Sequence, residues 1–118
     1  MKLHYLEIVT AEVDAVCAAY EATHGVRFAA ADPLLGGART ARLPDGCTVG
    51  VRASLRDTEA PVVRPYWLVD DIAAALEAAS KQGGSVAVPP MEIPGWGTIS
   101  IYLQGGNDHG LWQLPPPV

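Results

Sequence analysis

The sequence predicts an α+β fold made of two tandem βαβββ modules. The first observation is an internal repeat with an offset of 60 residues, seen when Gly37 is matched to Gly97. Glycines mark places where the backbone needs a positive φ or a close approach, so their recurrence indicates a repeated backbone. The second observation is that strand and helix patterns follow the same order in both halves. The other matched positions are Leu43 and Leu103, Gly46 and Gly106, and Gly50 and Gly110.

The first half has the features of a strand, a helix and three further strands. Apolar residues at helical spacing predict a helix over residues 12–23, and His24-Gly25 ends it with the residue type that helix C-termini favour. The segment Pro44-Asp45-Gly46 predicts a turn, because proline presets φ and glycine accepts a positive φ. Strands are expected over residues 3–9, 26–28, 38–43 and 47–55.

The second half repeats this order. Asp70 or Asp71 is expected to cap a helix that ends at Gly83-Gly84. Residues 89–97 cannot form a central strand, because their three prolines lack a backbone N–H. Strands are expected over residues 62–69, 85–88, 98–103 and 109–114. The chain is therefore interpreted as a single domain, residues 1–118, with module one at 1–57 and module two at 61–118.

Composition excludes several classes of protein. Hydrophobic residues make up 49% of the chain and charged residues 18%, which excludes a disordered chain, and no apolar run is long enough to span a membrane. The eight basic residues are scattered and the net charge is −5, so a nucleic-acid partner is not expected. The N-terminus has no signal-peptide pattern, so a cytoplasmic location is expected. Cys17 and Cys47 are expected to be small buried thiols.

Several motifs of the second half resemble the vicinal oxygen chelate superfamily, which includes glyoxalases, bleomycin-resistance proteins and extradiol dioxygenases. The likeness is strongest to an uncharacterised bacterial glyoxalase-like branch and covers essentially the whole chain, more loosely before residue 62. It implies curved, mostly antiparallel sheets around a shared cavity, with the helices outside, and a homodimer. The motifs are Tyr66-x-x-Val69-Asp70-Asp71-Ile72, Gly83-Gly84, Pro89-Pro90-x-x-Ile93-Pro94-Gly95-x-Gly97 and Gly110-Leu111-Trp112-Gln113.

The resemblance also implies where a metal would be held. Metal-dependent relatives carry one His or Glu ligand in the first and one in the last strand of each module. In this chain those positions fall on His4 or Tyr5, on Gly50, on Arg64 and on Gly110. A guanidinium is permanently protonated and cannot ligate, and glycine has no side chain. No metal and no other cofactor is therefore predicted.

Strand alternation selects the candidate site residues. Leu6 and Ile8 suit the face that packs on a helix, which sends Tyr5 and Glu7 to the opposite, cavity face. By the same reasoning Ile99, Ile101 and Leu103 are assigned to the helix side and Tyr102 to the cavity. The candidate ligand-binding residues are Tyr5, Glu7, Arg64, Tyr66, Trp96, Tyr102, His109 and Trp112.

Glu7 is the candidate general acid or base, because a buried carboxylate without a partner has a raised pKa. A structural ion pair with Arg64, or a contact with Tyr66, is the competing interpretation.

Three functional hypotheses follow. The favoured one is a metal-independent binder of a small aromatic or amphipathic molecule, similar to the drug-sequestering resistance proteins. The second is a lyase, isomerase or dioxygenase with a rearranged metal site or with acid/base chemistry through Glu7. The third is a non-catalytic dimerisation domain.

Overall fold

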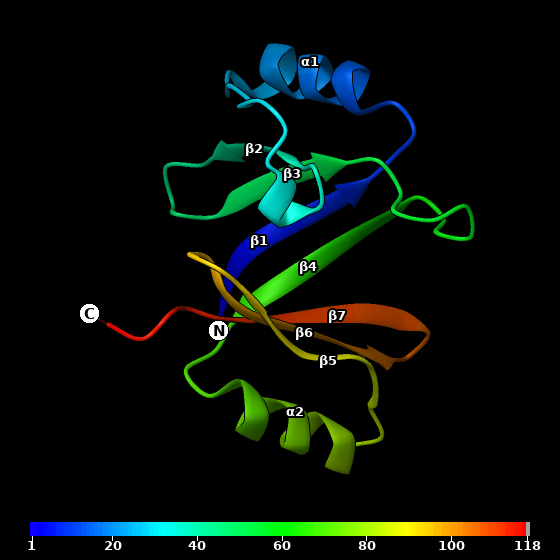
Figure 1. The fold of residues 1–118 in the computed structure, drawn as a ribbon, viewed down its shortest axis with the longest axis vertical. Helices are drawn as coiled ribbons and strands as arrows, with labels where there is room; N and C mark the ends of the chain where they lie inside the picture. Colours follow the sequence, from blue (N-terminus) through cyan, green and yellow to red (C-terminus); the bar gives the residue numbers. More distant parts are fainter. Residues whose placement is uncertain (118) are drawn as a thin grey trace. The chain divides into compact units, whose positions relative to one another are not determined.

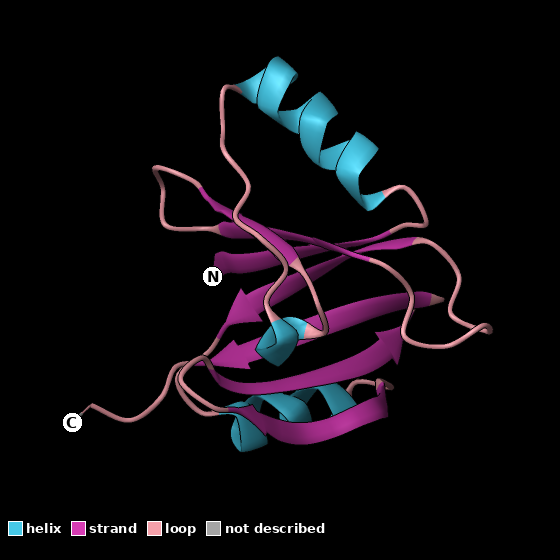
Figure 2. Ribbon diagram, turned by 45° about the horizontal axis from the view of Figure 1, so that its top comes forward, coloured by secondary structure: helices cyan, strands magenta, loops and turns pink. Residues whose placement is uncertain are grey.

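A computed structural model describes residues 1–117, and the chain divides into two compact units. The N-terminal unit is Tyr5–Val63, and the C-terminal unit is Met1–His4 with Arg64–Val118. Both units combine one α-helix with mixed parallel and antiparallel strands (Figures 1 and 2). The predicted α+β class is therefore confirmed.

In the N-terminal unit the strand order is β2-β3-β1. β1 pairs in parallel with β3, and β2 pairs antiparallel with β3. Gly25 ends α1 in the left-handed conformation, with φ of 70°, and its N–H donates to Glu21 O at 2.9 Å. The elements are β1 (Lys2–Val9), α1 (Val13–His24), a 3₁₀ turn η1 (Pro33–Leu35), β2 (Arg39–Arg42) and β3 (Thr48–Arg52).

The core of the N-terminal unit lies between α1 and one face of this sheet (Figure 1). Leu6 and Ile8 of β1 face the helix, as the alternation predicts, so Tyr5 and Glu7 lie on the helix-free face. Both cysteines are buried free thiols, as expected, and burial raises the pKa of the Cys17 thiol. The core cluster is Ile8, Cys17, Phe28, Ala41, Val49 and Val51.

In the C-terminal unit the strand order is β4-β7-β6-β5. β4 and β7 are parallel, while β7, β6 and β5 are antiparallel neighbours. Asp71 caps α2 by accepting a hydrogen bond from Ala74 N at 3.0 Å, which decides between the two predicted capping residues. The elements are β4 (Val62–Leu68), α2 (Ile72–Lys81), β5 (Ser85–Ile93), β6 (Gly97–Gln104) and β7 (Asn107–Gln113).

The strand predicted over residues 26–28 is absent, so that prediction is wrong. The N–H of Phe28 donates to the Glu21 carboxylate at 2.8 Å, and Ala29 N donates to Thr40 O at 2.8 Å. A side chain therefore takes the hydrogen bond that a strand ladder would use. Phe28 still packs in the core, which explains the apolar pattern.

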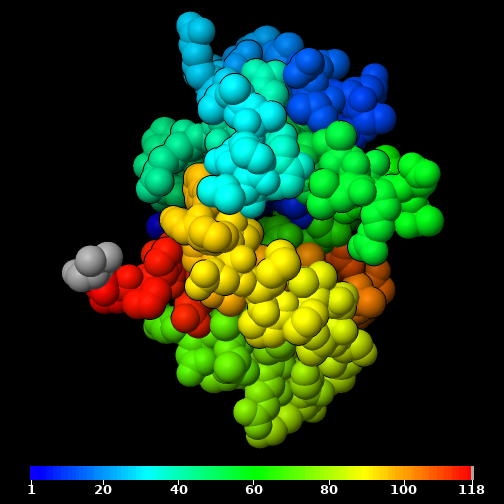
Figure 3. All heavy atoms as spheres, viewed as in Figure 1, coloured from blue at the N-terminus to red at the C-terminus, as the bar shows by residue number. Residues whose placement is uncertain are grey.

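β5 extends further than predicted, through Pro89 and Pro90 to Ile93. It is the outermost strand of its unit and lies on the surface in Figure 3 (yellow). Irregular register on both sides of Val88 accommodates the prolines, whose missing N–H groups an edge strand tolerates. The prediction that this stretch is not a central strand is confirmed.

In residues 1–117, neither helix is long and apolar enough to cross a bilayer.

Replacing Asp71 with alanine should lower the free energy of unfolding by about 1 kcal/mol, because it removes the side-chain cap of α2. Urea denaturation followed by circular dichroism measures this. Asp70→Ala is the matched control, since Asp70 is an exposed neighbouring aspartate outside the cap, and it should leave stability unchanged. Equal losses in the two variants would contradict the role assigned to Asp71.

Candidate functional site

The ring of Tyr5 occupies the space above Gly50 in the N-terminal unit. The parallel register of β1 and β3 places Glu7 opposite Gly50 and Tyr5 opposite Thr48. A Cβ atom at Gly50 would overlap the Tyr5 hydroxyl group, so any side chain there is excluded while the ring stays in place. Tyr5 is 4% exposed, and burial, reinforced by the Glu7 carboxylate, raises the pKa of its phenol. Tyr5 is therefore a protonated hydroxyl at neutral pH.

The same combination recurs in the C-terminal unit. Tyr66 of β4 lies opposite Gly110 of β7, and a Cβ atom at Gly110 would overlap the Tyr66 ring. Tyr66 is 5% exposed. In both units a glycine of the last strand thus leaves room for a tyrosine of its parallel neighbour. Glu7 pairs with Gly50 as Tyr66 pairs with Gly110, so Glu7 is the residue that corresponds to Tyr66. Their separation is 59 residues (66 − 7), and the 60-residue offset of the repeat therefore does not hold in β1.

Glu7 belongs to a buried ionic network in the N-terminal unit. Its Oε2 accepts a hydrogen bond from Arg52 Nε at 2.9 Å, and the two residues are 8% and 6% exposed. The Arg52 guanidinium also donates to both carboxylate oxygens of Glu59, at 2.9 and 2.8 Å. These hydrogen bonds to Glu59, with the charge of Glu7, raise the pKa of Arg52 against the opposing effect of burial. Glu7 therefore has a buried cationic hydrogen-bond partner in Arg52.

Arg52 and Glu59 were not among the predicted site residues. Arg52 lies two positions after Gly50 in β3, so strand alternation places it on the same face as that glycine. That spacing was a usable signal. Glu59 lies in the segment between β3 and β4, where no periodicity exists, and its Oε1 also accepts from Leu55 N at 2.7 Å.

Arg64 of β4 forms an ion pair in the C-terminal unit. Its Nε and Nη2 donate to Asp108 Oδ2 at 3.0 and 2.8 Å, and Arg64 is 8% exposed. At this position, where the resemblance expects a metal ligand, the guanidinium offers hydrogen-bond donors and a positive charge.

Trp112 is the centre of an aromatic group in the C-terminal unit. Its ring lies 5.7 Å from that of Tyr66 in an edge-to-face arrangement and 5.2 Å from that of His4. The indole N–H donates to the Trp96 carbonyl at 2.9 Å, which fixes the β5–β6 turn to β7. Trp112 is 2% exposed, whereas the Trp96 residue is half-buried. The structure thus brings together Tyr66, Trp112 and the Trp96 backbone.

Tyr102 lies on the other face, so its predicted assignment is wrong. It packs against the α2 core of Ile72 and Leu76, and its ring stacks on His109, 5.2 Å away. His109 is the direct cross-strand partner of Tyr102, and one of its ring nitrogens lies 3.0 Å from the Gln104 carbonyl oxygen. Both residues therefore belong to the helix-covered side.

The predicted assignment of the β6 isoleucines to the helix side is wrong for the same reason. Ile99 and Ile101 are the cross-strand partners of Trp112 and Gly110, and so share the face of Tyr66. Both faces of β6 carry buried residues, since Ile99, Ser100 and Ile101 are all buried. Alternation alone cannot tell which buried face a helix covers.

The residues at the expected ligand positions do not fit a metal. Gly50 and Gly110 supply no donor atom, and Arg64 supplies a cation. Within residues 1–117, no group of three His, Cys, Asp or Glu side chains is arranged to hold a metal ion.

Ionisation of Tyr5 should destabilise the protein at alkaline pH. The pKa of Tyr5 is raised above its ordinary value of 10.0, so below about pH 10 the phenol is neutral whether the chain is folded or unfolded. Above that pH the unfolded chain loses the proton first, and stability falls as pH rises. In Tyr5→Phe this part of the alkaline loss should disappear, as urea denaturation between pH 8 and about pH 11 would show.

Tyr20→Phe is the control, because Tyr20 is a partly buried tyrosine of the same unit. It should keep the alkaline slope of the unsubstituted protein. The interpretation fails if Tyr5→Phe loses stability as steeply as Tyr20→Phe.

The chain is similar to known proteins in its structure but not in its sequence. No family model matches the chain, and no curated protein matches it. A hypothetical protein, BH1468 from Bacillus halodurans C-125, superposes with a TM-score of 0.79 at 9% identity, covering 99% of this chain and 96% of that one.

Methylmalonyl-CoA epimerases are also structural neighbours. The Mycobacterium tuberculosis enzyme superposes with a TM-score of 0.75 at 17% identity, covering 97% of this chain and 88% of that chain. A Streptomyces coelicolor variant in complex with 2-nitronate-propionyl-CoA gives 0.72 at 17% identity, covering 98% and 99%. These epimerases belong to the vicinal oxygen chelate superfamily, so the chain has the fold of superfamily members.

Proposed function

We propose that this chain is a metal-independent member of the vicinal oxygen chelate superfamily that binds a small aromatic or amphipathic molecule. The observation that carries the proposal is the recurrence of tyrosine over glycine, Tyr5 over Gly50 and Tyr66 over Gly110. At these glycine positions the resemblance expects a metal ligand. A His or Glu side chain there would need the space that the phenol rings fill. The chain would therefore have the fold of the superfamily without its metal site.

The polar composition of the helix-free faces supports binding rather than simple packing. Glu7, Arg52 and Arg64 are all buried, and burying charged groups costs free energy even when they are paired. Such groups are more typical of functional sites than of cores built only for stability. In a binding role, the rings of Tyr66 and Trp112 would contact the flat or apolar part of the ligand. The Arg64–Asp108 pair would orient a polar group.

Ligand entry requires movement, because Tyr66 and Trp112 are almost fully buried. We assign that movement to the β5–β6 turn that carries Trp96. Two hydrogen bonds hold the turn, from Trp96 N to Ile93 O and from Trp112 Nε1 to Trp96 O, both at 2.9 Å. Breaking the second one would release the indole of Trp112 from the turn.

The solved neighbours support a small-molecule site in this fold, since one of them is an epimerase in complex with 2-nitronate-propionyl-CoA. Function belongs to sites rather than folds, and this fold carries several activities. The proposal for this chain is therefore restricted to binding. We also propose a homodimer in solution, which sedimentation velocity would establish.

A thermal-shift screen tests the proposed function. The panel contains aromatic carboxylates, aromatic antibiotics and acyl-CoA esters. A ligand at 100 times its Kd should stabilise the fold by about 2.7 kcal/mol, which raises Tm by several degrees. Arg64→Lys keeps the charge but loses the planar donor pair, so calorimetry should show binding weakened about tenfold.

Arg42→Lys, at an exposed arginine of β2, is the matched control and should bind as the unsubstituted protein does. A screen without any stabilising compound would count against the proposal. So would stoichiometric Zn, Ni, Mn or Fe in protein purified without chelator.

Proton transfer by Glu7 is the second candidate function. Its carboxylate is buried and is oriented by a hydrogen bond from Arg52 Nε at 2.9 Å, and a carboxylate held in place in this way is a candidate general base. Epimerisation of an acyl-CoA requires removal of the proton next to the thioester carbonyl. Solvent-deuterium exchange into methylmalonyl-CoA, abolished in Glu7→Gln, would support this candidate. Absence of exchange would reject it and leave the binding proposal intact.

A further inference from the structure

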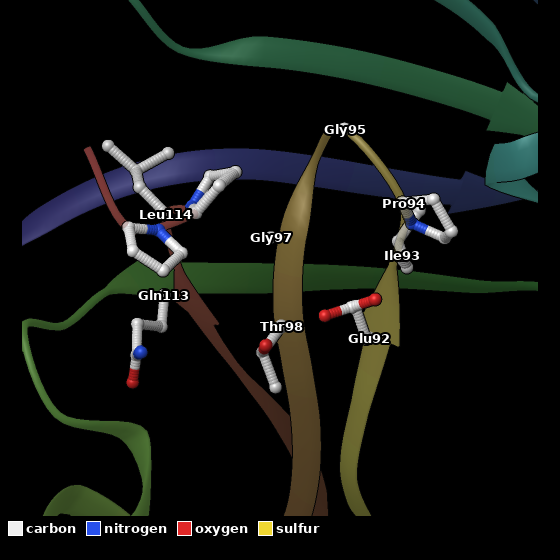
Figure 4. Close-up of a pocket in the computed structure, with 10 residues that line it drawn as sticks. Glu92, Ile93, Pro94, Gly95, Gly97, Thr98, Gln113 and Leu114 are labelled. Atoms are coloured by element: carbon white, nitrogen blue, oxygen red, sulfur yellow. The ribbon is translucent and has the colours of Figure 1, made fainter. Parts of the chain in front are cut away.

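We infer that a second ligand site for a small amine with an apolar body lies in the C-terminal unit, in a hollow of about 250 Å³. Three chain segments form this hollow: the end of β5, the start of β6 and the residues that follow β7 (Figure 4). It shares no residue with the predicted ligand-binding set. The lining residues used below are Glu92, Pro94, Thr98, Gln113, Leu114 and Pro115.

Polar side chains cross the three segments as one row. Glu92 of β5 is the cross-strand partner of Thr98 of β6, and Thr98 is the partner of Gln113 of β7. Direct partners project from the same face of a sheet, so the carboxylate, hydroxyl and amide are neighbours. In Figure 4 the Glu92 carboxylate extends towards the Thr98 side chain.

The walls of the hollow are held in place without a ligand. A Cβ atom at Gly97 would overlap the Gln113 carbonyl oxygen, so the strands approach closely there because residue 97 is glycine. The Gln113 Oε1 atom accepts from Ile72 N at 2.8 Å, which fixes this side chain against the start of α2. Pro94 and Pro115 have restricted backbones. Binding would therefore require little ordering of the protein.

The charge of the hollow selects a cation. Glu92 supplies a carboxylate and Thr98 a hydroxyl oxygen, while no Lys or Arg lines the hollow. Among residues 1–117, no cationic side chain forms an ion pair with Glu92. Leu114 and the prolines provide apolar walls. An ammonium group would donate to Glu92 and Thr98 while its apolar substituent covers these walls.

The size of the hollow limits the ligand. Its volume of about 250 Å³ is below the range of roughly 300 to 1,000 Å³ that suits drug-sized molecules. Benzylamine is an appropriate probe, because it combines a protonated amine with one ring. Since Glu92 is exposed, its single ion pair adds modest affinity, and we expect a Kd of about 1 mM at low salt.

The experiment is a titration of the ¹⁵N-labelled full chain with benzylamine, followed by amide chemical shifts. Saturable shifts should be confined to Gly95, Gly97, Thr98 and Gln113 and their neighbours. Benzyl alcohol and benzoate, which match the probe in shape and differ in charge, should bind at least about fivefold more weakly.

Glu92→Gln should weaken benzylamine binding about fivefold, and Thr98→Val should weaken it by a smaller factor. Glu12→Gln removes an exposed carboxylate of the N-terminal unit and should change nothing. The inference is overturned if benzyl alcohol produces the same shifts, if Glu92→Gln binds equally well, or if the shifts do not saturate. Because these probes and residues differ from those of the proposed function, either proposal can fail without the other.

Discussion

The close contact between a tyrosine ring and a glycine in the neighbouring parallel strand is the constraint on which the candidate site depends. A phenol ring can approach the backbone of the next strand this closely only where that strand lacks a side chain. In the N-terminal unit Gly50 provides this space for Tyr5, and in the C-terminal unit Gly110 provides it for Tyr66. Each tyrosine therefore makes its glycine obligatory. A substitution that introduced a metal ligand at either glycine would have to displace a buried aromatic ring.

Ionic contacts accompany these rings. On the helix-free face of the N-terminal unit Arg52 links Glu7 of β1 to Glu59, which lies between β3 and β4. In the C-terminal unit Arg64 links β4 to Asp108 of β7. A buried pair adds little net stability over well-packed apolar residues, but losing one partner is costly. Each of these arginines is accordingly accompanied by at least one carboxylate of opposite charge.

Local signals in the sequence were sufficient for most of the fold. The C-terminal glycine of α1 and the aspartate cap of α2 lie where local chemistry predicts them, and β1 alternates as expected. The non-local features were less accessible. Both faces of β6 carry buried residues. The alternation of Tyr102 with its isoleucine neighbours does not show which of the two faces α2 covers. Arg52, a partner of Glu7, was not predicted because the pairing of β1 with β3 brings it beside Glu7, and spacing along the chain shows only that Arg52 shares the face of Gly50.

The two prolines of β5 also determine how this chain can associate. An outer strand with a full set of free N–H and C=O groups is a template for pairing with another chain, whereas Pro89 and Pro90 interrupt its row of donors. In the N-terminal unit the outer strand β2 is four residues long and both begins and ends with arginine. Pairing with another chain is therefore disfavoured at β5 and at β2. The proposed homodimer would then use side-chain packing rather than a hydrogen-bond ladder through either of these two strands.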